Sequence, residues 1–198
     1  MPRRMMMSIG FLVIALALPL SASQFVKLPF DQVAREATYV VRGTVENTWS
    51  AWDDAHEVIF TYATVRVNRY FGETTGPDTL VVREVGGTVG NYTQEAIGFP
   101  AIRNGEDVVL FLSRWEDAPE LRIHAYNQGK FLVRNRDGVD VLIEDSVKQG
   151  EDGINRGARP SIRTESVDVP AFRMDEFAQM VDAARAGARV DIDRTRIQ

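Results

Sequence analysis

Tyr39-Val-Val-Arg-Gly-Thr-Val45 is the stretch of sequence that decides the predicted fold. Apolar and polar side chains alternate along it, which is typical of a β-strand with one buried face, and we predict a strand over residues 38–49. Gly43 interrupts the apolar face in mid-strand, where it would permit a bend or bulge. A strand that bends in this way can serve two sides of a closed barrel.

The sequence downstream of this strand is rich in further strand signals. Residues 107–113 are a continuous apolar run that indicates a strand buried on both faces, and Asp137-Gly138 indicates a tight hairpin. Helical spacing of apolar residues occurs only near the two ends, over 30–37 and 171–187. We therefore predict a mainly β protein, a small closed barrel of about five to seven antiparallel strands with a short N-terminal helix and a C-terminal helix. The remaining strands are predicted at 57–70, 79–85, 107–113, 121–126, 130–134 and 139–143.

The N-terminus has the three parts of an export signal. Arg3 and Arg4 precede an apolar run over 9–20 that is too short to span a bilayer, and small residues follow at 21–23. We expect residues 1–23 to be a signal peptide and the mature protein to be secreted or periplasmic, with no membrane anchor after cleavage. The remaining divisions that we expect are the barrel domain at 24–143, a linker or arm at 144–170, the C-terminal helix at 171–187 and a tail at 188–198.

Composition limits the chemistry and the partners. The chain has no cysteine, which excludes disulfides, thiol catalysis and cysteine-ligated zinc. Its net charge of −5 disfavours phosphate backbones, so we expect no nucleic-acid partner. No cofactor is indicated. The expected partner is an unknown protein or small ligand outside the cytoplasm.

The longest connection, residues 86–106, is too long for a hairpin turn. Such a loop is usually functional or carries a short helix of its own. Its glycines lack the Lys-Ser/Thr pair of a phosphate-binding loop, so backbone freedom at a turn is the simpler interpretation. Together with aromatic residues near the ends of the first strands, it is the predicted binding surface, comprising Trp49, Trp52, Gly86, Gly87, Gly90, Tyr92 and Phe99.

The order of elements resembles the tissue-inhibitor-of-metalloproteinase (netrin-like) branch of the OB fold. It also resembles uncharacterised secreted bacterial proteins of the same plan. The resemblance covers about residues 30–143 and implies an OB-like barrel. In the inhibitors it would also imply an N-terminal cysteine that chelates the protease's zinc, which this chain does not have. The matching stretches are 39–45, Glu84-Val-Gly-Gly87, Gly98-Phe-Pro100, 104–112 and Gln128-Gly-Lys-Phe131.

Reactive side chains form no recognisable catalytic motif. Asp53, Asp54 and His56 are weak candidates for a metal site, but adjacent residues in a turn rarely converge on one ion. Strand alternation predicts that His124 points outward as a surface histidine. The favoured function is a non-catalytic binding or interaction module. The alternatives are an inhibitor of an extracellular protease, possible on the resemblance alone, and a hydrolase that uses His56 or His124.

Overall fold

The computed structural model describes residues 27–144 and 170–190. The predicted signal peptide, almost all of the predicted arm and the end of the predicted tail lie outside these residues. No helix in the described part of the chain is both long and apolar enough to cross a membrane.

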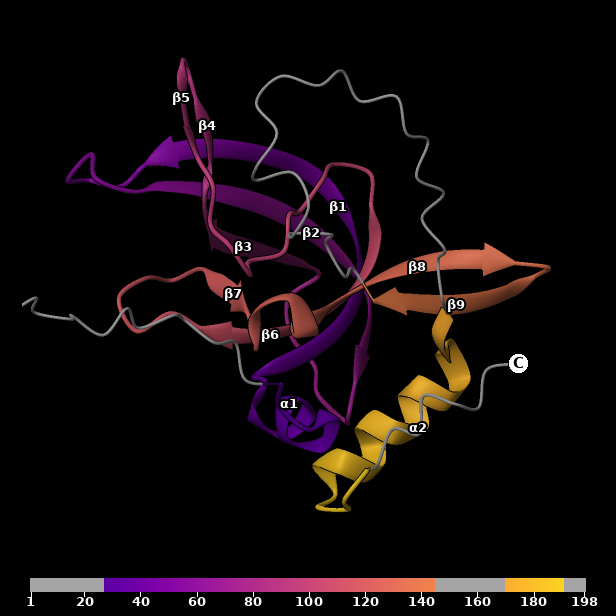
Figure 1. Ribbon diagram of the computed structural model, residues 1–198. Helices are drawn as coiled ribbons and strands as arrows, with labels where there is room; N and C mark the ends of the chain where they lie inside the picture. Colours follow the sequence, from indigo (N-terminus) through magenta and orange to yellow (C-terminus); the bar gives the residue numbers. More distant parts are fainter. Residues whose placement is uncertain (1–26, 145–169, 191–198) are drawn as a thin grey trace, which may run out of the picture.

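Five strands close into a barrel (Figure 1). Going around it, the order is β1 (Tyr39–Trp52), β2 (Ile59–Phe71), β3 (Thr79–Val85), β7 (Leu121–Ile123) and β6 (Asp107–Arg114), and β6 pairs with β1 again. The predicted closed barrel is thus confirmed. The prediction that all strands are antiparallel is wrong, because β3 and β7 run parallel. Strand directions cannot alternate around a closed ring with an odd number of members, so one parallel pair is required.

β1 serves two sides of the barrel, as the sequence predicts. It pairs with β2 along its whole length and with β6 over residues 39–44. The pairing with β2 shifts register between Arg42 and Gly43. A Cβ atom on Gly43 would lie 2.6 Å from Cγ1 of Val65 and 2.7 Å from the carbonyl oxygen of Arg66. Only glycine therefore lets β2 approach this closely at the bend.

Two hydrophobic cores share the wall formed by β1 and β6. Along β6, Val108 and Leu110 fill the barrel, whereas Val109 and Phe111 point outside it into a second core. This division explains the continuous apolar run in the sequence, since both faces of the strand are buried. The barrel core comprises Val41, Val45, Ala63, Val65, Leu80, Val82, Ile102, Val108, Leu110, Leu112, Leu121 and Ile123.

The second core lies between the barrel and two helices. Strands β8 (Lys130–Arg136), β9 (Val139–Glu144) and β10 (Pro170–Arg173) extend the sheet from β6, and α1 (Phe30–Glu36) and α2 (Met174–Arg185) cover it (Figure 1). The predicted hairpin between β8 and β9 is confirmed. The C-terminal helix begins at Met174 instead of 171, because the preceding residues pair with β9 as a strand. At the centre lies Phe177, whose ring contacts Phe30, Phe71, Phe111, Phe131 and Phe172.

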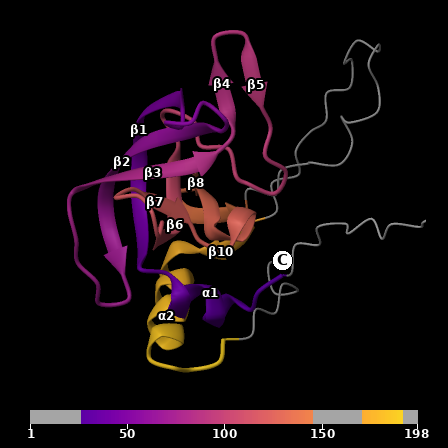
Figure 2. The same ribbon diagram turned by 90° about the vertical axis from the view of Figure 1, so that its left-hand side faces the viewer.

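The long connection between β3 and β6 carries a hairpin of its own, instead of the short helix that we considered. Strands β4 (Gly87–Val89) and β5 (Tyr92–Gln94) form a separate two-stranded sheet. Figure 2 shows this hairpin projecting from the end of the barrel beyond β1 and β2. It thus remains a candidate for contact with a partner.

Candidate functional site

Trp49 lies on the outer surface of the barrel, stacked on Tyr62 of the neighbouring strand. The two residues are in register, and their rings are 5.3 Å apart and nearly parallel at 9°. Trp49 is 42% exposed. A second register shift, between Val45 and Asn47, turns its side chain outward, because skipping one residue reverses the alternation of faces.

The outer surface continues from Tyr62 to a stack of rings and guanidinium groups. Tyr62 pairs in register with Arg83 on β3. The Arg83 guanidinium carbon lies between two rings, 4.5 Å from the centre of Phe60 and 4.8 Å from that of Trp115. The Arg122 guanidinium carbon lies 5.3 Å from the centre of the same Trp115 ring. Cation–π contacts of this kind hold guanidinium groups in place. We call Trp49, Phe60, Tyr62, Arg83, Trp115 and Arg122 the aromatic–guanidinium face.

Hydrogen bonds hold this face to the strands beneath it. The indole Nε1 of Trp115 donates to the carbonyl oxygen of Arg83 at 3.0 Å, and Nε of Arg122 donates to the Ser113 hydroxyl at 3.3 Å. Arg83 is largely covered, whereas Arg122 is exposed. The face therefore offers an open indole ring at one end and an accessible cation at the other.

Trp52 occupies the opposite face of the β1–β2 ribbon from Trp49. It pairs with Ile59, and its ring meets Tyr92 of the β4–β5 hairpin edge to face, with the centres 5.8 Å apart. The His56 ring also stacks on that of Trp52, with the ring centres 6.3 Å apart. Residues three apart on a strand point to opposite faces. The structure therefore separates two tryptophans that the sequence interpretation assigned to one surface.

The glycines of the predicted surface have a packing role. A Cβ atom on Gly87, whose φ is +139°, would lie 2.5 Å from both the Ser50 and the Thr61 hydroxyl oxygens. Thr61 also donates to the carbonyl oxygen of Gly86 at 2.7 Å. Gly90 lies at the hairpin tip, in open space. Gly86 and Gly87 thus let the hairpin lie against the ribbon and position Tyr92 beside Trp52.

Phe99 lies in the loop after the β4–β5 hairpin and has a different neighbour. Its ring meets that of Tyr126 edge to face, 5.0 Å away. The backbone N–H of Asn127 also donates to the carbonyl oxygen of Gly98 at 3.2 Å. These contacts join the loop to the 3₁₀ turn at Tyr126–Gly129. Phe99 therefore anchors a loop beside that turn, whereas Tyr92 packs on Trp52.

The weak metal candidates form a turn. Oδ1 of Asp53 accepts hydrogen bonds from the N–H groups of Glu57 and Val58 at 2.8 and 3.1 Å. The hydrogen bond from Val58, and to a lesser extent that from Glu57, lowers the pKa of the Asp53 carboxyl. Among the residues that the structure describes, no group of three or more His, Asp or Glu side chains is placed to hold a metal ion. The Asp53 carboxylate is used to close the turn between β1 and β2.

His124 is mostly buried, and the prediction of a surface histidine is wrong. The strand β7 ends at Ile123, and Ala125 and Tyr126 take left-handed conformations, so strand alternation does not extend to this residue. Its side chain is 15% exposed, with Nε2 at 3.4 Å from Oε2 of Glu36 on α1. Burial lowers the pKa of the imidazole. His56 and His124 therefore have separate surroundings and are not joined in one site.

Glu84 is buried at the parallel seam of the barrel. Only Val82 and Leu121 pair between β3 and β7, and the Glu84 carboxyl accepts a hydrogen bond from the N–H of Ile123 just beyond that pair. The residue is 3% exposed, and burial raises the pKa of its carboxyl from 4.5 to about 8. Glu84 thus completes a short strand pairing as a neutral acid at neutral pH.

No protein-family model, no curated protein and no solved structure matches this chain. The site can therefore be assigned only from the arrangement of side chains in this structure. Sequence reasoning identified Trp49 but missed Tyr62, Arg83, Trp115 and Arg122 as its neighbours. One signal was available: Phe60 and Tyr62 make the first half of β2 apolar on both faces.

Proposed function

We propose that the protein is an exported, non-catalytic binding module that holds an oligosaccharide on its aromatic–guanidinium face. The exposed Trp49 ring, supported from behind by Tyr62, carries this proposal. Neither ring belongs to either hydrophobic core, so the stacked pair lies outside the two buried clusters and remains accessible to a ligand. Export is expected from the signal-like residues 1–23.

The chemistry of the face suits a sugar chain. A flat aromatic ring can cover the apolar face of a sugar ring, while Arg122 and the neighbouring hydroxyl of Ser113 can bond to its oxygens. OB-type barrels, which this chain resembles, bind oligosaccharides and oligonucleotides on the outer surface of their second and third strands. The net charge of −5 favours the sugar over a phosphate backbone.

A binding experiment with three variants tests this proposal. The full chain would be titrated with neutral and uronate-containing oligosaccharides and with a single-stranded oligonucleotide. We expect saturable oligosaccharide binding that Trp49→Ala and Arg122→Ala each weaken about tenfold or more. Trp52→Ala is the matched control, because its ring lies on the opposite face of the same ribbon. Binding of the oligonucleotide alone, or equal binding by Trp49→Ala and the wild type, would contradict the proposal.

A second candidate is recognition of an extracellular protease by the projecting β4–β5 hairpin. Tyr92 on the hairpin and Ile97 in the loop after it support this candidate, since they are 67% and 73% exposed. An exposed aromatic on a rigid hairpin is a common anchor in protein interfaces. Inhibition assays against secreted metalloproteases, with Tyr92→Ala as the variant, test it. Absence of inhibition by the wild-type chain over a broad panel would remove this candidate.

A further inference from the structure

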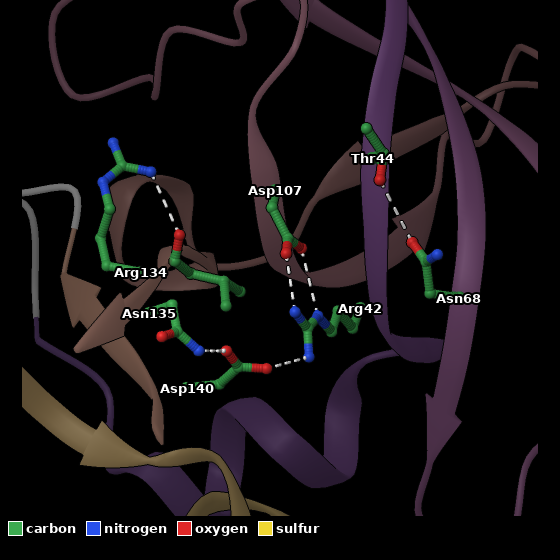
Figure 3. A network of polar contacts seen from close by, with 8 residues as sticks. Arg42, Thr44, Asn68, Asp107, Arg134, Asn135 and Asp140 are labelled. Carbon is green, nitrogen blue, oxygen red and sulfur yellow. Dashed lines mark hydrogen bonds and ion pairs between the residues drawn. The ribbon is translucent and has the colours of Figure 1, made fainter. Parts of the chain in front are cut away.

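A polar cavity lies where the barrel meets the second core. It has a volume of about 290 Å³ and shares no lining residue with either binding surface discussed above. Its walls come from β1, β2, β6 and the first residue of α2. Figure 3 shows four of its polar lining residues, which are Arg42, Thr44, Asn68 and Asp107. The complete lining is Arg42, Thr44, Asn68, Arg69, Asp107 and Met174.

One wall of the cavity is rigid. Arg42 donates to both carboxylate oxygens of Asp107, at 3.2 and 2.7 Å, and to Asp140 of β9 at 2.7 Å (Figure 3). Asn135 in turn holds Asp140 through a hydrogen bond of 2.9 Å. The hydrogen bond to Asp107, followed by that to Asp140, raises the pKa of Arg42 above its already high value. Arg42 is thus a fixed cation, with three of its five N–H donors directed to these carboxylates.

The neighbouring strand carries a second guanidinium group, which is exposed and has no carboxylate partner. Arg69 pairs in register with Arg42 across β1 and β2. Its guanidinium carbon lies 4.7 Å from the ring centre of Phe71. Within residues 27–144 and 170–190, Arg69 forms no ion pair. Asp107 and Asp140 already balance the charge of Arg42, so Arg69 is the guanidinium group that can bind an added anion.

A bulge adds a neutral donor beside Arg69. Asn68 is the residue that the β1–β2 pairing skips at the register shift between Arg42 and Gly43. Its Oδ1 accepts a hydrogen bond from the Thr44 hydroxyl at 3.3 Å. The two amide hydrogens remain available for donation. The same irregularity that bends β1 therefore brings an amide and a guanidinium group to one cavity.

We propose that this cavity binds a small organic monocarboxylate. The carboxylate accepts hydrogen bonds from Arg69 and Asn68, and the apolar part of the ligand lies against Met174. Arginine forks suit carboxylates because two parallel N–H bonds match the two oxygens. The volume lies at the lower limit of small-molecule sites, so the ligand is small. A second acidic group would approach Asp107, which disfavours dicarboxylates.

Calorimetric titration of the full chain at constant ionic strength tests the site. The probes are butyrate, succinate and inorganic phosphate, with chloride as the reference salt. We expect saturable binding of butyrate that is stronger than that of succinate or phosphate. Arg69→Gln should weaken it at least about tenfold. The matched control is Arg66→Gln, because Arg66 lies on the same strand, outside the cavity, and pairs with Glu46 at 2.7 Å.

The outcomes separate a binding site from a structural contact. Absence of saturable butyrate binding, or unchanged binding by Arg69→Gln, would overturn the proposal. A second readout is the stability of the unliganded variants. Arg69→Gln removes an exposed side chain whose guanidinium group lies on the Phe71 ring, so it should lower the midpoint of urea unfolding only slightly. A large fall of the midpoint would mean that Arg69 is retained for the stability of the fold, and would also overturn the proposal.

Discussion

Replacing Glu84 with glutamine should remove a pH dependence that this buried carboxyl imposes on the fold. Glutamine keeps an oxygen that can accept the N–H of Ile123, so the strand seam is preserved. It differs from the glutamate in having no charge to bury. The variant therefore isolates the free energy of ionising a carboxyl inside the barrel.

The sign and size of the effect follow from the shift of the Glu84 pKa. Burial raises this pKa from 4.5 to about 8, so between these values the native state retains a proton that the unfolded chain has lost. The stabilisation that this proton supplies is complete below about pH 4.5 and is lost as the pH rises towards 8. One pKa unit corresponds to about 1.4 kcal/mol. Relative to low pH, the unfolding free energy of the wild type should accordingly fall by ~1 kcal/mol at pH 5, ~3 kcal/mol at pH 7 and ~5 kcal/mol at pH 9.

Urea unfolding followed by tryptophan fluorescence at pH 5, 7 and 9 measures this dependence. The difference in unfolding free energy between Glu84→Gln and the wild type should grow steadily with pH in favour of the variant. Glu46→Gln serves as the control, since Glu46 lies at the surface in a pair with Arg66. A difference that is the same at all three pH values would refute the reasoning, because it would mean that Glu84 is equally ionised in both states.

Three further substitutions test the packing. Lys130→Met should cost about 3–5 kcal/mol of unfolding free energy, because Lys130 is fully buried and holds Glu106 and the carbonyl oxygen of Ala101; a loss below ~1 kcal/mol in urea unfolding would contradict this. Gly43→Ala should cost about 1–3 kcal/mol, since its Cβ atom would collide with β2, and thermal unfolding that is unchanged would show that β2 moves freely. Phe177→Ala should cost about 3–5 kcal/mol in the same assay, because its ring is fully buried among five others.

The barrel could be predicted from sequence because its signals are local. The alternation around Gly43 and the apolar run of β6 each depend on a few neighbouring residues, and both indicated the observed strands. The strand β10 could not be found in this way, since it comprises only four residues and is defined by its pairing with β9. The hairpin β4–β5 was missed for a similar reason, as its strands have three residues each.

The aromatic–guanidinium face and the polar cavity were harder to predict, because each depends on a bulge. The register shift after Val45 places Trp49 outside the barrel, and the shift after Arg42 leaves Asn68 unpaired beside Arg69. Alternation counted from Val41 and Val45 would have assigned Trp49 to the interior. A bulge is set by how two strands fit together in space, so neither strand's sequence reveals it alone. His124 illustrates the same limit, because the strand predicted over 121–126 ends three residues earlier, at Ile123.

The wall that β1 and β6 share between the two cores has a consequence for how the protein can be divided. Val109 and Phe111 are kept from water by helices that come from opposite ends of the chain. A fragment that stopped after β9 would have a complete barrel. It would also expose part of the second hydrophobic core to solvent and would be prone to self-association. Helix α2 is thus required to cover the second hydrophobic core. We expect a recombinant fragment that contains only the barrel to precipitate.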